Sequence, residues 1–491
     1  MSASLIAFIS AAAIGTALTP AIRDLAHRCG WLDHALTSRK IHGKPIPRLG
    51  GVGIVLAFFM SLGAMLVFDA DVAGRFFAQP GKAFGLFAGG LGIAALGIVD
   101  DVRGVRARHK FLVQLAMAAL VYALGYRIDQ IANPFGPPIP LGLLGLPFTV
   151  FWITGVINAL NLIDGLDGLA GGVALMAVGT IFAVATGAGE PLMMLFAAAL
   201  GGAVLGFLFF NFNPASIFMG DTGSMFLGFI LATTSIATNT KSATGGIALV
   251  IPIVALGLPI GDTLLAMGRR AVRGVPVFTP DRGHIHHRLL DRGLSHRQAV
   301  LTLYAVSLTL GLGSVSLAWL PGRVAPVILA ALGLAGFAFL RWLGFFDHRA
   351  TKALLEQRRR NLELRAALRE IAESLEYAET PGEVWGELQR AAKPLGASAI
   401  ALRLEDMDGE GSEFSVGFEN GHAGLLHARF GLNVERPGSR RIELGWTDGR
   451  RSLDRDTESA IEQLSDDVAG AIERIEKAQD ERRRFSLRLV G

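Results

Sequence analysis

The sequence predicts an all-α polytopic membrane domain followed by a smaller α+β domain. Of the 491 residues, 51% are hydrophobic, and the mean hydropathy of +0.44 is too high for an ordinary soluble protein. About eleven apolar stretches, each near the ~20 residues that cross a bilayer, occupy residues 1–345. From about Asp347 the composition becomes charged and polar.

The predicted spans follow one another along the membrane domain. The first begins almost at Met1 without a basic start, and no small-residue cleavage pattern follows it, so we expect a retained span and not a signal peptide. We place the spans at about Leu5–Ala21, Val52–Phe68, Ala83–Val99, Phe111–Tyr126, Leu146–Leu162, Gly172–Thr186, Leu192–Phe210, Met225–Thr238, Ile247–Met267, Val300–Leu320 and Val324–Leu343.

Basic residues concentrate in alternate loops. One set of loops carries the basic residues between Arg23 and Arg48, between Arg103 and Lys110, and between Arg269 and Arg297. The opposite loops hold only Arg75, Lys82, Arg127, Lys241 and Arg323. The positive-inside rule therefore predicts a multi-pass protein of the inner (plasma) membrane, with its amino terminus outside and its carboxyl end in the cytoplasm. This pattern favours membrane orientation over nucleic-acid binding.

The polar carboxyl-terminal part is predicted to form a helical linker over 346–378 and an α+β domain over 379–480. The linker carries a helical stripe of leucine and isoleucine that is too short for a coiled coil. Thr380 to Glu383 reads as a capping box that starts a helix ending near Lys393-Pro394. Alternating runs then predict strands, and a final amphipathic helix follows; the runs are Ala399–Leu404, Phe414–Phe418, Leu425–Phe430 and Arg441–Trp446. This order resembles a GAF-type domain, and the competing interpretation is a domain for packing or homodimer formation.

Four polar segments interrupt the apolar part, and all fall on the predicted cytoplasmic side. The first, Asp100-Asp101, ends the third span beside a basic stretch. Adjacent carboxylates raise each other's pKa unless a metal ion or arginine is near. The pair is equally consistent with a solvated span end.

The segment from Asn158 to Gly168 is more specific. Asn158, Asn161, Asp164 and Asp167 stand at three-residue steps and are expected to line one helical face. Polar groups there cost free energy unless they bind something or pair. Interhelical hydrogen bonds explain one or two of these residues but hardly all four.

The remaining two segments carry an aspartate at a helix start and a histidine cluster. Asp221 follows Met219-Gly220 at the start of the eighth span, where a simple helix cap is the alternative to a metal ligand. His284, His286 and His287 lie with Arg288 in a long loop, where imidazoles can bind diphosphate oxygens. Zinc is the rival for such a cluster, but the nearby arginines oppose a cation, and Cys29 is the single cysteine.

Together these segments resemble the polyprenyl-phosphate N-acetylhexosamine-1-phosphate transferase family. The matching segments are Ser38 to His42, Pro47 to Gly51, Asp100-Asp101, Asn158 to Gly168, Phe218 to Ser224 and His284 to Leu289. Ala35 departs from the family, which often has proline there. The sequence His-Ile-His-His resembles the N-acetylglucosamine-1-phosphate branch, whereas three consecutive histidines mark the muramyl-pentapeptide branch.

The resemblance implies transfer of a sugar phosphate from a UDP-sugar to polyprenyl (undecaprenyl) phosphate, with release of UMP, at the start of lipid-linked cell-envelope polysaccharide synthesis. It implies Mg²⁺, with Mn²⁺ as the alternative, held by Asn161 and Asp221. Catalytic roles fall to Asp100, Asp101, Asp164 and Asp167. Substrate binding falls to Lys40, His42, Asn158, His284, His286, His287 and Arg288. Direct attack and a covalent aspartyl intermediate both stay open.

Two other functions compete with this interpretation. A secondary transporter would use intramembrane carboxylates, but transporters place them near the midplane on broken helices, whereas here they gather at span ends. A membrane-anchored sensor would combine a degenerate enzyme core with an active carboxyl-terminal domain.

Overall fold

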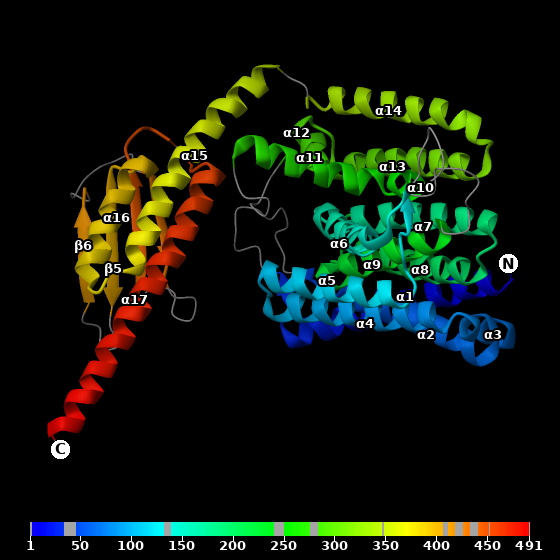
Figure 1. Ribbon diagram of the computed structural model, residues 1–491, viewed down its shortest axis with the longest axis horizontal. Coiled ribbons are helices and arrows are strands. Elements are labelled where there is room, and N and C mark those ends of the chain that lie inside the picture. The colour runs from blue at the N-terminus through cyan, green and yellow to red at the C-terminus, as the bar shows by residue number, and fades with distance from the viewer. Residues whose placement is uncertain are drawn as a thin grey trace. The chain divides into compact units, whose positions relative to one another are not determined.

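The computed structural model describes residues 2–33, 46–131, 139–239, 250–274, 283–345, 348–405, 411–417, 426–432, 440–450 and 452–490 (Figure 1). The chain divides into two compact units. The first comprises Met1–Ala266 and Arg282–Phe345, and the second comprises Met267–Asp281 and Phe346–Gly491.

The first unit is a bundle of helices with two short antiparallel strand pairs. Strands β1 (Leu32–Asp33) and β2 (Ile46–Pro47) form one pair, and β3 (Gln130–Ile131) and β4 (Ile139–Pro140) form the other. The helices are α1 (Ser2–Cys29), α2 (Gly50–Phe68), α3 (Ala70–Ala78), α4 (Pro80–Arg103), α5 (Ala107–Ala123), α6 (Gly145–Ile163), α7 (Leu169–Ala188), α8 (Pro191–Asn211), α9 (Gly220–Asn239), α10 (Val250–Ala255), α11 (Gly257–Arg273), α12 (Ile285–Asp291), α13 (His296–Trp319) and α14 (Ala325–Trp342). The part of α11 from Met267 onward belongs to the second unit.

Helix α9 is the centre of this bundle. It packs against α2, α4, α6, α7 and α8, and Figure 1 shows it in the middle of the unit. Its side chains Phe226, Phe229 and Ile230 are fully buried. The hydroxyls of Thr233 and Thr234 donate to carbonyls one turn earlier in the same helix, which satisfies them without water. Helix α9 therefore offers its two ends, and not its sides, to the surroundings.

Eight helical segments in the described part of the chain are long and apolar enough to cross a membrane, so this is a membrane protein. They coincide with eight of the eleven predicted spans. The other three predictions, near Phe111, Met225 and Ile247, fall on α5, on the less apolar α9 and on a stretch that forms two helices, α10 and α11. The count of eleven crossings stays a prediction.

The second unit packs helices against an antiparallel sheet. Helices α15 (His348–Glu376), α16 (Pro381–Leu395) and α17 (Arg455–Val490) accompany strands β5 (Ala399–Glu405), β6 (Gly411–Val416), β7 (Leu426–Gly431) and β8 (Arg440–Trp446), in the spatial order β6-β5-β8-β7. The stripe of α15, with Leu364, Ile371 and Leu375, is buried in the same core as the sheet. The helix predicted as a linker therefore contributes to this core. The GAF-type resemblance stays a prediction.

The predicted capping box of α16 forms only in part. The Thr380 hydroxyl accepts a hydrogen bond from the Glu383 N–H at 3.3 Å. The Glu383 carboxylate, however, accepts from the N–H of Glu379, one residue before the expected donor. The cap still fixes the start of α16, because its first open N–H groups are satisfied.

Candidate active site

The carboxyl end of α4 touches the start of α9, backbone against backbone. A Cβ atom on Gly97 would overlap the Cα of Thr222, and one on Gly220 would lie 2.6 Å from Oδ2 of Asp101. Gly220 also has φ +71°, a left-handed conformation that favours glycine. The two glycines therefore bring Asp100-Asp101 directly beside Asp221.

Asp101 caps α9 from the neighbouring helix. Its carboxylate accepts hydrogen bonds from the N–H groups of Asp221 and Thr222, at 2.8 and 3.0 Å, and from the Thr222 hydroxyl at 2.6 Å. A carboxylate at a helix start satisfies open N–H groups and is favoured by the helix dipole. Because Asp101 supplies the cap, the Asp221 carboxylate is not needed for it and turns to other partners. The predicted role of Asp101 in catalysis stays a prediction.

Asp221 is the centre of a small polar network. Its Oδ1 accepts from the Asn161 side-chain amide at 3.0 Å, and its Oδ2 accepts from the Lys110 ammonium at 2.9 Å. Lys110 also donates to Oδ2 of Asp100 at 2.9 Å, so one ammonium bridges two carboxylates. The same Asn161 amide donates to the Ser224 hydroxyl at 2.9 Å. Three predicted site residues, Asp100, Asn161 and Asp221, are thus brought together.

Lys110 was not among the predicted site residues. It stands one residue before the fourth predicted span, in a basic loop that topology alone explains. Its distance from Asp221 in the sequence, 111 residues, hides the pairing. Its position could have indicated it, because a lysine at a span boundary close to the predicted acidic pair Asp100-Asp101 is a candidate phosphate ligand.

Asp164 lies beyond the end of α6, near the other acids. Burial raises the pKa of Asp164 to about 7, and the charges of Asp221, Asp101 and Asp167 raise it further in the same direction. Helix α6 ends at Ile163, and Gly168 with φ +78° turns the chain into α7. The prediction that four polar residues line one helical face is therefore wrong for Asp164 and Asp167, which lie beyond the helix.

Asn158 and Asp167 hold the scaffold. The Asn158 side-chain amide donates to Gln114 of α5 at 2.7 Å and to the Thr154 carbonyl at 2.8 Å. Oδ2 of Asp167 accepts from the side chain of Asn213 at 2.9 Å and from the N–H of Ala215 at 3.1 Å, in the connection before α9. Their predicted roles, substrate binding for Asn158 and catalysis for Asp167, stay predictions.

The donor set suits a hard divalent cation. The Lys110 ammonium bridges Asp100 and Asp221, and the carboxylates of Asp101 and Asp164 lie near Asp221, so the carboxylates outnumber the one cationic side chain in the network. Mg²⁺ is usually held by one or two carboxylates together with substrate phosphates and water. Within the described residues, no group of three or more His, Cys, Asp or Glu side chains is arranged so that it could hold a metal ion by itself. A cation here would therefore complete its coordination with substrate.

The histidines lie on and just before α12, next to the acidic turn. His286 packs against Gly165, where a Cβ would lie 2.6 Å from its Nε2. Burial lowers the pKa of His286 to about 3, so this ring is neutral near pH 7. The rings of His284 and His286 are stacked, with centroids 5.8 Å apart, and His287 lies 4.3 Å from His286. The predicted histidine and aspartate segments thus adjoin in space.

Two contacts around α12 were not predicted. His284 Nδ1 lies 2.8 Å from Oδ2 of Asp262, a residue of α11. The Arg288 guanidinium lies 4.0 Å from the centre of the Phe345 ring and donates to the Leu343 carbonyl at 3.3 Å. Asp262 had a signal in the sequence, since it is a lone acid within the predicted span Ile247–Met267. Phe345 had no signal in the sequence, because an aromatic residue that packs against an arginine cannot be told there from one that is exposed.

Lys40 and His42 lie outside the described residues. The neighbouring segment Pro47 to Gly51 docks onto the start of α9. The N–H groups of Gly50 and Gly51 donate to the carbonyls of Phe218 and Met219 at 2.9 and 2.8 Å. A Cβ on Gly51 would overlap the backbone nitrogen of Gly223. This part of the predicted motif therefore builds the site's backbone.

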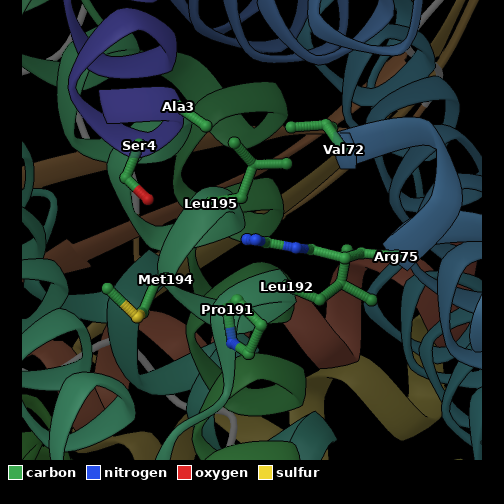
Figure 2. Close-up of a pocket in the computed structure, with 8 residues that line it drawn as sticks. All are labelled: Ala3, Ser4, Val72, Arg75, Pro191, Leu192, Met194 and Leu195. Carbon is green, nitrogen blue, oxygen red and sulfur yellow. The ribbon is translucent and has the colours of Figure 1, made fainter. Parts of the chain in front are cut away.

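A small cavity is lined by residues outside the acidic cluster (Figure 2). It is lined by Ser4, Arg75, Leu192 and neighbouring residues, near the amino-terminal end of α8, whereas Asn211 at the other end of α8 contacts the turn that follows Asp167. A helix of this length spans about 30 Å. The cavity volume of about 30 Å³ admits water but no nucleotide sugar.

The chain is similar in sequence to several known proteins. Residues 83–239 match the model of Glycosyl transferase family 4. The probable undecaprenyl-phosphate N-acetylglucosaminyl 1-phosphate transferase of Bacillus subtilis is 37% identical over 313 residues, which cover 64% of this chain and 84% of that protein. The decaprenyl-phosphate N-acetylglucosaminephosphotransferase of Mycobacterium tuberculosis H37Rv is 33% identical over 354 residues, 68% of this chain and 87% of that protein.

A more distant relative has a different named substrate. The phospho-N-acetylmuramoyl-pentapeptide-transferase of Heliobacterium modesticaldum is 32% identical over 239 residues, 45% of this chain and 71% of that protein. All three relatives are named as transferases of a phosphorylated N-acetyl sugar, and the matches to the first two extend over most of each relative. The chain therefore belongs to glycosyl transferase family 4, the polyprenyl-phosphate N-acetylhexosamine-1-phosphate transferases.

Proposed function

We propose that the protein transfers N-acetylglucosamine-1-phosphate from UDP-N-acetylglucosamine to undecaprenyl or a similar polyprenyl phosphate, releasing UMP. The observation that carries this proposal is the meeting of Asp100, Lys110, Asn161 and Asp221 at the ends of four helices. Phosphoryl transfer depends mainly on positioning and charge neutralisation, which Lys110 and a cation held by the carboxylates would supply here. The N-acetylglucosamine donor is supported by the His-Ile-His-His sequence and by the names of the two more similar relatives.

Asp221 and Asn161 are the residues that would hold Mg²⁺ or Mn²⁺. Their oxygens are hard donors, and the local excess of negative charge favours a divalent cation. When bound, the ion would neutralise phosphate charge and orient the diphosphate. Asp164, whose protonated form is favoured by burial and by the neighbouring carboxylates, would ionise more readily beside the ion.

In the reaction, an oxygen of the lipid phosphate attacks the phosphorus attached to the sugar. A new P–O bond joins the two phosphates, and the bond to the UMP oxygen breaks. A phosphate monoester with a second pKa near ~6 is already mostly dianionic at pH 7, so strong base catalysis is unnecessary. Lys110 is placed to contact a phosphate oxygen, and Asp100 holds its ammonium at 2.9 Å. Asp100 then acts chiefly by orienting Lys110.

The same arrangement speaks against a transporter. Transporters bind ions near the bilayer midplane on broken helices. Here the acids stand at the end of α4, beyond the end of α6 and at the start of α9. We place this end of the bundle in the cytoplasm of the inner membrane, because the basic loops adjoin it. A UDP-sugar and a membrane phosphate can both reach such a boundary. The product would start a lipid-linked cell-wall polymer or lipopolysaccharide.

The test is UMP release by the purified protein with polyprenyl phosphate and a panel of UDP-N-acetylhexosamines. We expect release with UDP-N-acetylglucosamine in Mg²⁺ and none in EDTA. Release with another donor only would reject the donor assignment. The absence of release with every donor and both metals would falsify the enzymatic proposal.

A further inference from the structure

Asp262, a buried aspartate on α11, contacts His284 of the histidine segment. Asp262 and His284 are only 2% and 6% exposed, and Asp262 Oδ2 lies 2.8 Å from His284 Nδ1. The other carboxylate oxygen accepts the N–H of Ile285, the first residue of α12, at 2.8 Å. Burying a carboxylate in an apolar bundle costs several kcal/mol unless its oxygens are satisfied. Here each oxygen has a partner in or just before α12.

The two contacts constrain one ring in two ways. A carboxylate only accepts hydrogen bonds, so the Asp262 contact requires the proton of His284 to be on Nδ1. The contact with Ile285 holds the adjoining backbone, so the position of the ring is fixed as well. Nε2 is then left as the ring's remaining polar atom, a hydrogen-bond acceptor when the ring is neutral and a donor when it is protonated.

His284 is also linked by ring contacts to the turn that carries Asp164. Its ring stacks on His286, which packs against Gly165, the residue after Asp164. The buried Nδ1 of His286 has no hydrogen-bond partner in the part of the chain that the structure describes. A change in the His284 ring would therefore reach His286 and the acidic turn by direct contact.

From these contacts we propose that Asp262 is a positioning residue of the transfer reaction. It keeps His284 in the form with a proton on Nδ1, so that Nε2 is presented to a phosphate oxygen of the nucleotide donor. This inference rests on the proposed function for its substrate, but the tautomer itself does not. Asp262→Asn would replace one acceptor oxygen by an NH₂ donor, which favours the opposite tautomer of His284 while keeping the size of the side chain.

The test is a double-mutant cycle with Asp262→Asn, His284→Ala and the combination. We expect Asp262→Asn to lower kcat/KM by about 10- to 100-fold, the usual effect of removing a residue that orients a functional histidine. In the His284→Ala background it should have no further effect, because Asp262 acts through that ring. Asp291→Asn, which changes an exposed carboxylate at the end of α12, is the matched control and should keep wild-type kinetics.

The competing explanation is a purely structural ion pair. Losses that simply add in the double variant, or an unchanged kcat/KM in Asp262→Asn, would overturn the proposal. If Asp262→Asn does not fold, the wild-type protein still decides. NMR of ¹⁵N-histidine-labelled protein, with the His284 signal among eleven histidines assigned through His284→Ala, should show a protonated Nδ1. A bare Nδ1 with a protonated Nε2 would refute the tautomer and the proposal with it.

The experiments distinguish a failure of the proposed function from a failure of the role of Asp262. A wild-type protein that releases no UMP with any donor, yet carries the Nδ1 proton on His284, would reject the proposed function and with it the role of Asp262 in transfer, leaving only the tautomer. An active wild-type protein with additive variants would reject the role of Asp262 while leaving the function intact.

Discussion

Replacing Lys110 with methionine should reduce transfer strongly while keeping the fold. The ammonium of Lys110 contacts both Asp100 and Asp221 at 2.9 Å, and all three side chains are only partly exposed. Methionine keeps the length and apolar stem of lysine but removes the charge. Because exposed and half-exposed ion pairs contribute little to stability, we expect only a small shift in the unfolding temperature.

The effect on turnover should be much larger. Removing one preorganised donor to a developing charge typically lowers the rate by about 10²- to 10³-fold, or roughly 3 to 4 kcal/mol. We therefore expect a fall of that size in kcat/KM, measured as UMP release at saturating Mg²⁺. Lys82→Met, at the opposite end of α4, is the control and should remain within about threefold of the wild type.

A second variant separates the roles of the two partners. If Asp100 acts mainly by holding Lys110, then Asp100→Asn should cost little more in the Lys110→Met background. Lys110→Met with nearly wild-type kcat/KM would refute the assignment of Lys110. Fully additive losses would show that Asp100 has a separate role, such as direct contact with the lipid phosphate.

Further predictions concern the cation site, the backbone contacts, pH and the second unit. Asp221→Asn should abolish UMP release at every Mg²⁺ concentration while the unfolding temperature is kept; full activity would remove the metal assignment. Gly97→Ala should lower the unfolding temperature, since overpacking costs about 1 to 3 kcal/mol or more, whereas Gly63→Ala, with open space around it, should not. Burial raises the pKa of Asp164 to about 7 in the folded protein, from 3.8 in the unfolded chain. Without divalent cations, the folded protein therefore loses stability as the pH rises between those values. Asp164→Asn should raise the unfolding temperature more at pH 8 than at pH 5, and an equal change at both would contradict this. Deleting residues from 349 onward should leave UMP release measurable, because the acidic cluster lies in the first unit; its loss in a folded truncation would show that the second unit is required.

Much of the architecture follows from local patterns in the sequence. Apolar stretches predict the helices, because crossing a bilayer requires about 20 apolar residues, and eight predicted spans coincide with suitable helices. The strands of the second unit follow from alternating residues and differ from prediction by only a few positions. Helix α9, predicted as a span, is less apolar than the eight suitable helices, because a helix surrounded by protein needs fewer apolar side chains than one surrounded by lipid.

The site was predictable in its residue types and not in its contacts. Asp100, Asn161 and Asp221 stand out because polar groups in apolar runs require a reason. That Asp101 caps α9, and that Asp167 holds the connection before α9, depends on which helices adjoin, and no local pattern carries that information. The glycines do not reveal these contacts either, since the role of Gly97 and Gly51 depends on the backbone that faces them in the folded protein.

The cap that Asp101 supplies to α9 has a mechanical consequence. A helix whose first turn is fastened to another helix cannot slide along it, so α4 and α9 must shift as one body when the lipid bilayer thins or thickens around them. Tilting of the outer helices can absorb such changes while the spacing between Asp100 and Asp221 is kept. Transfer rates should accordingly vary little among bilayers of different acyl-chain length, as long as the protein remains inserted.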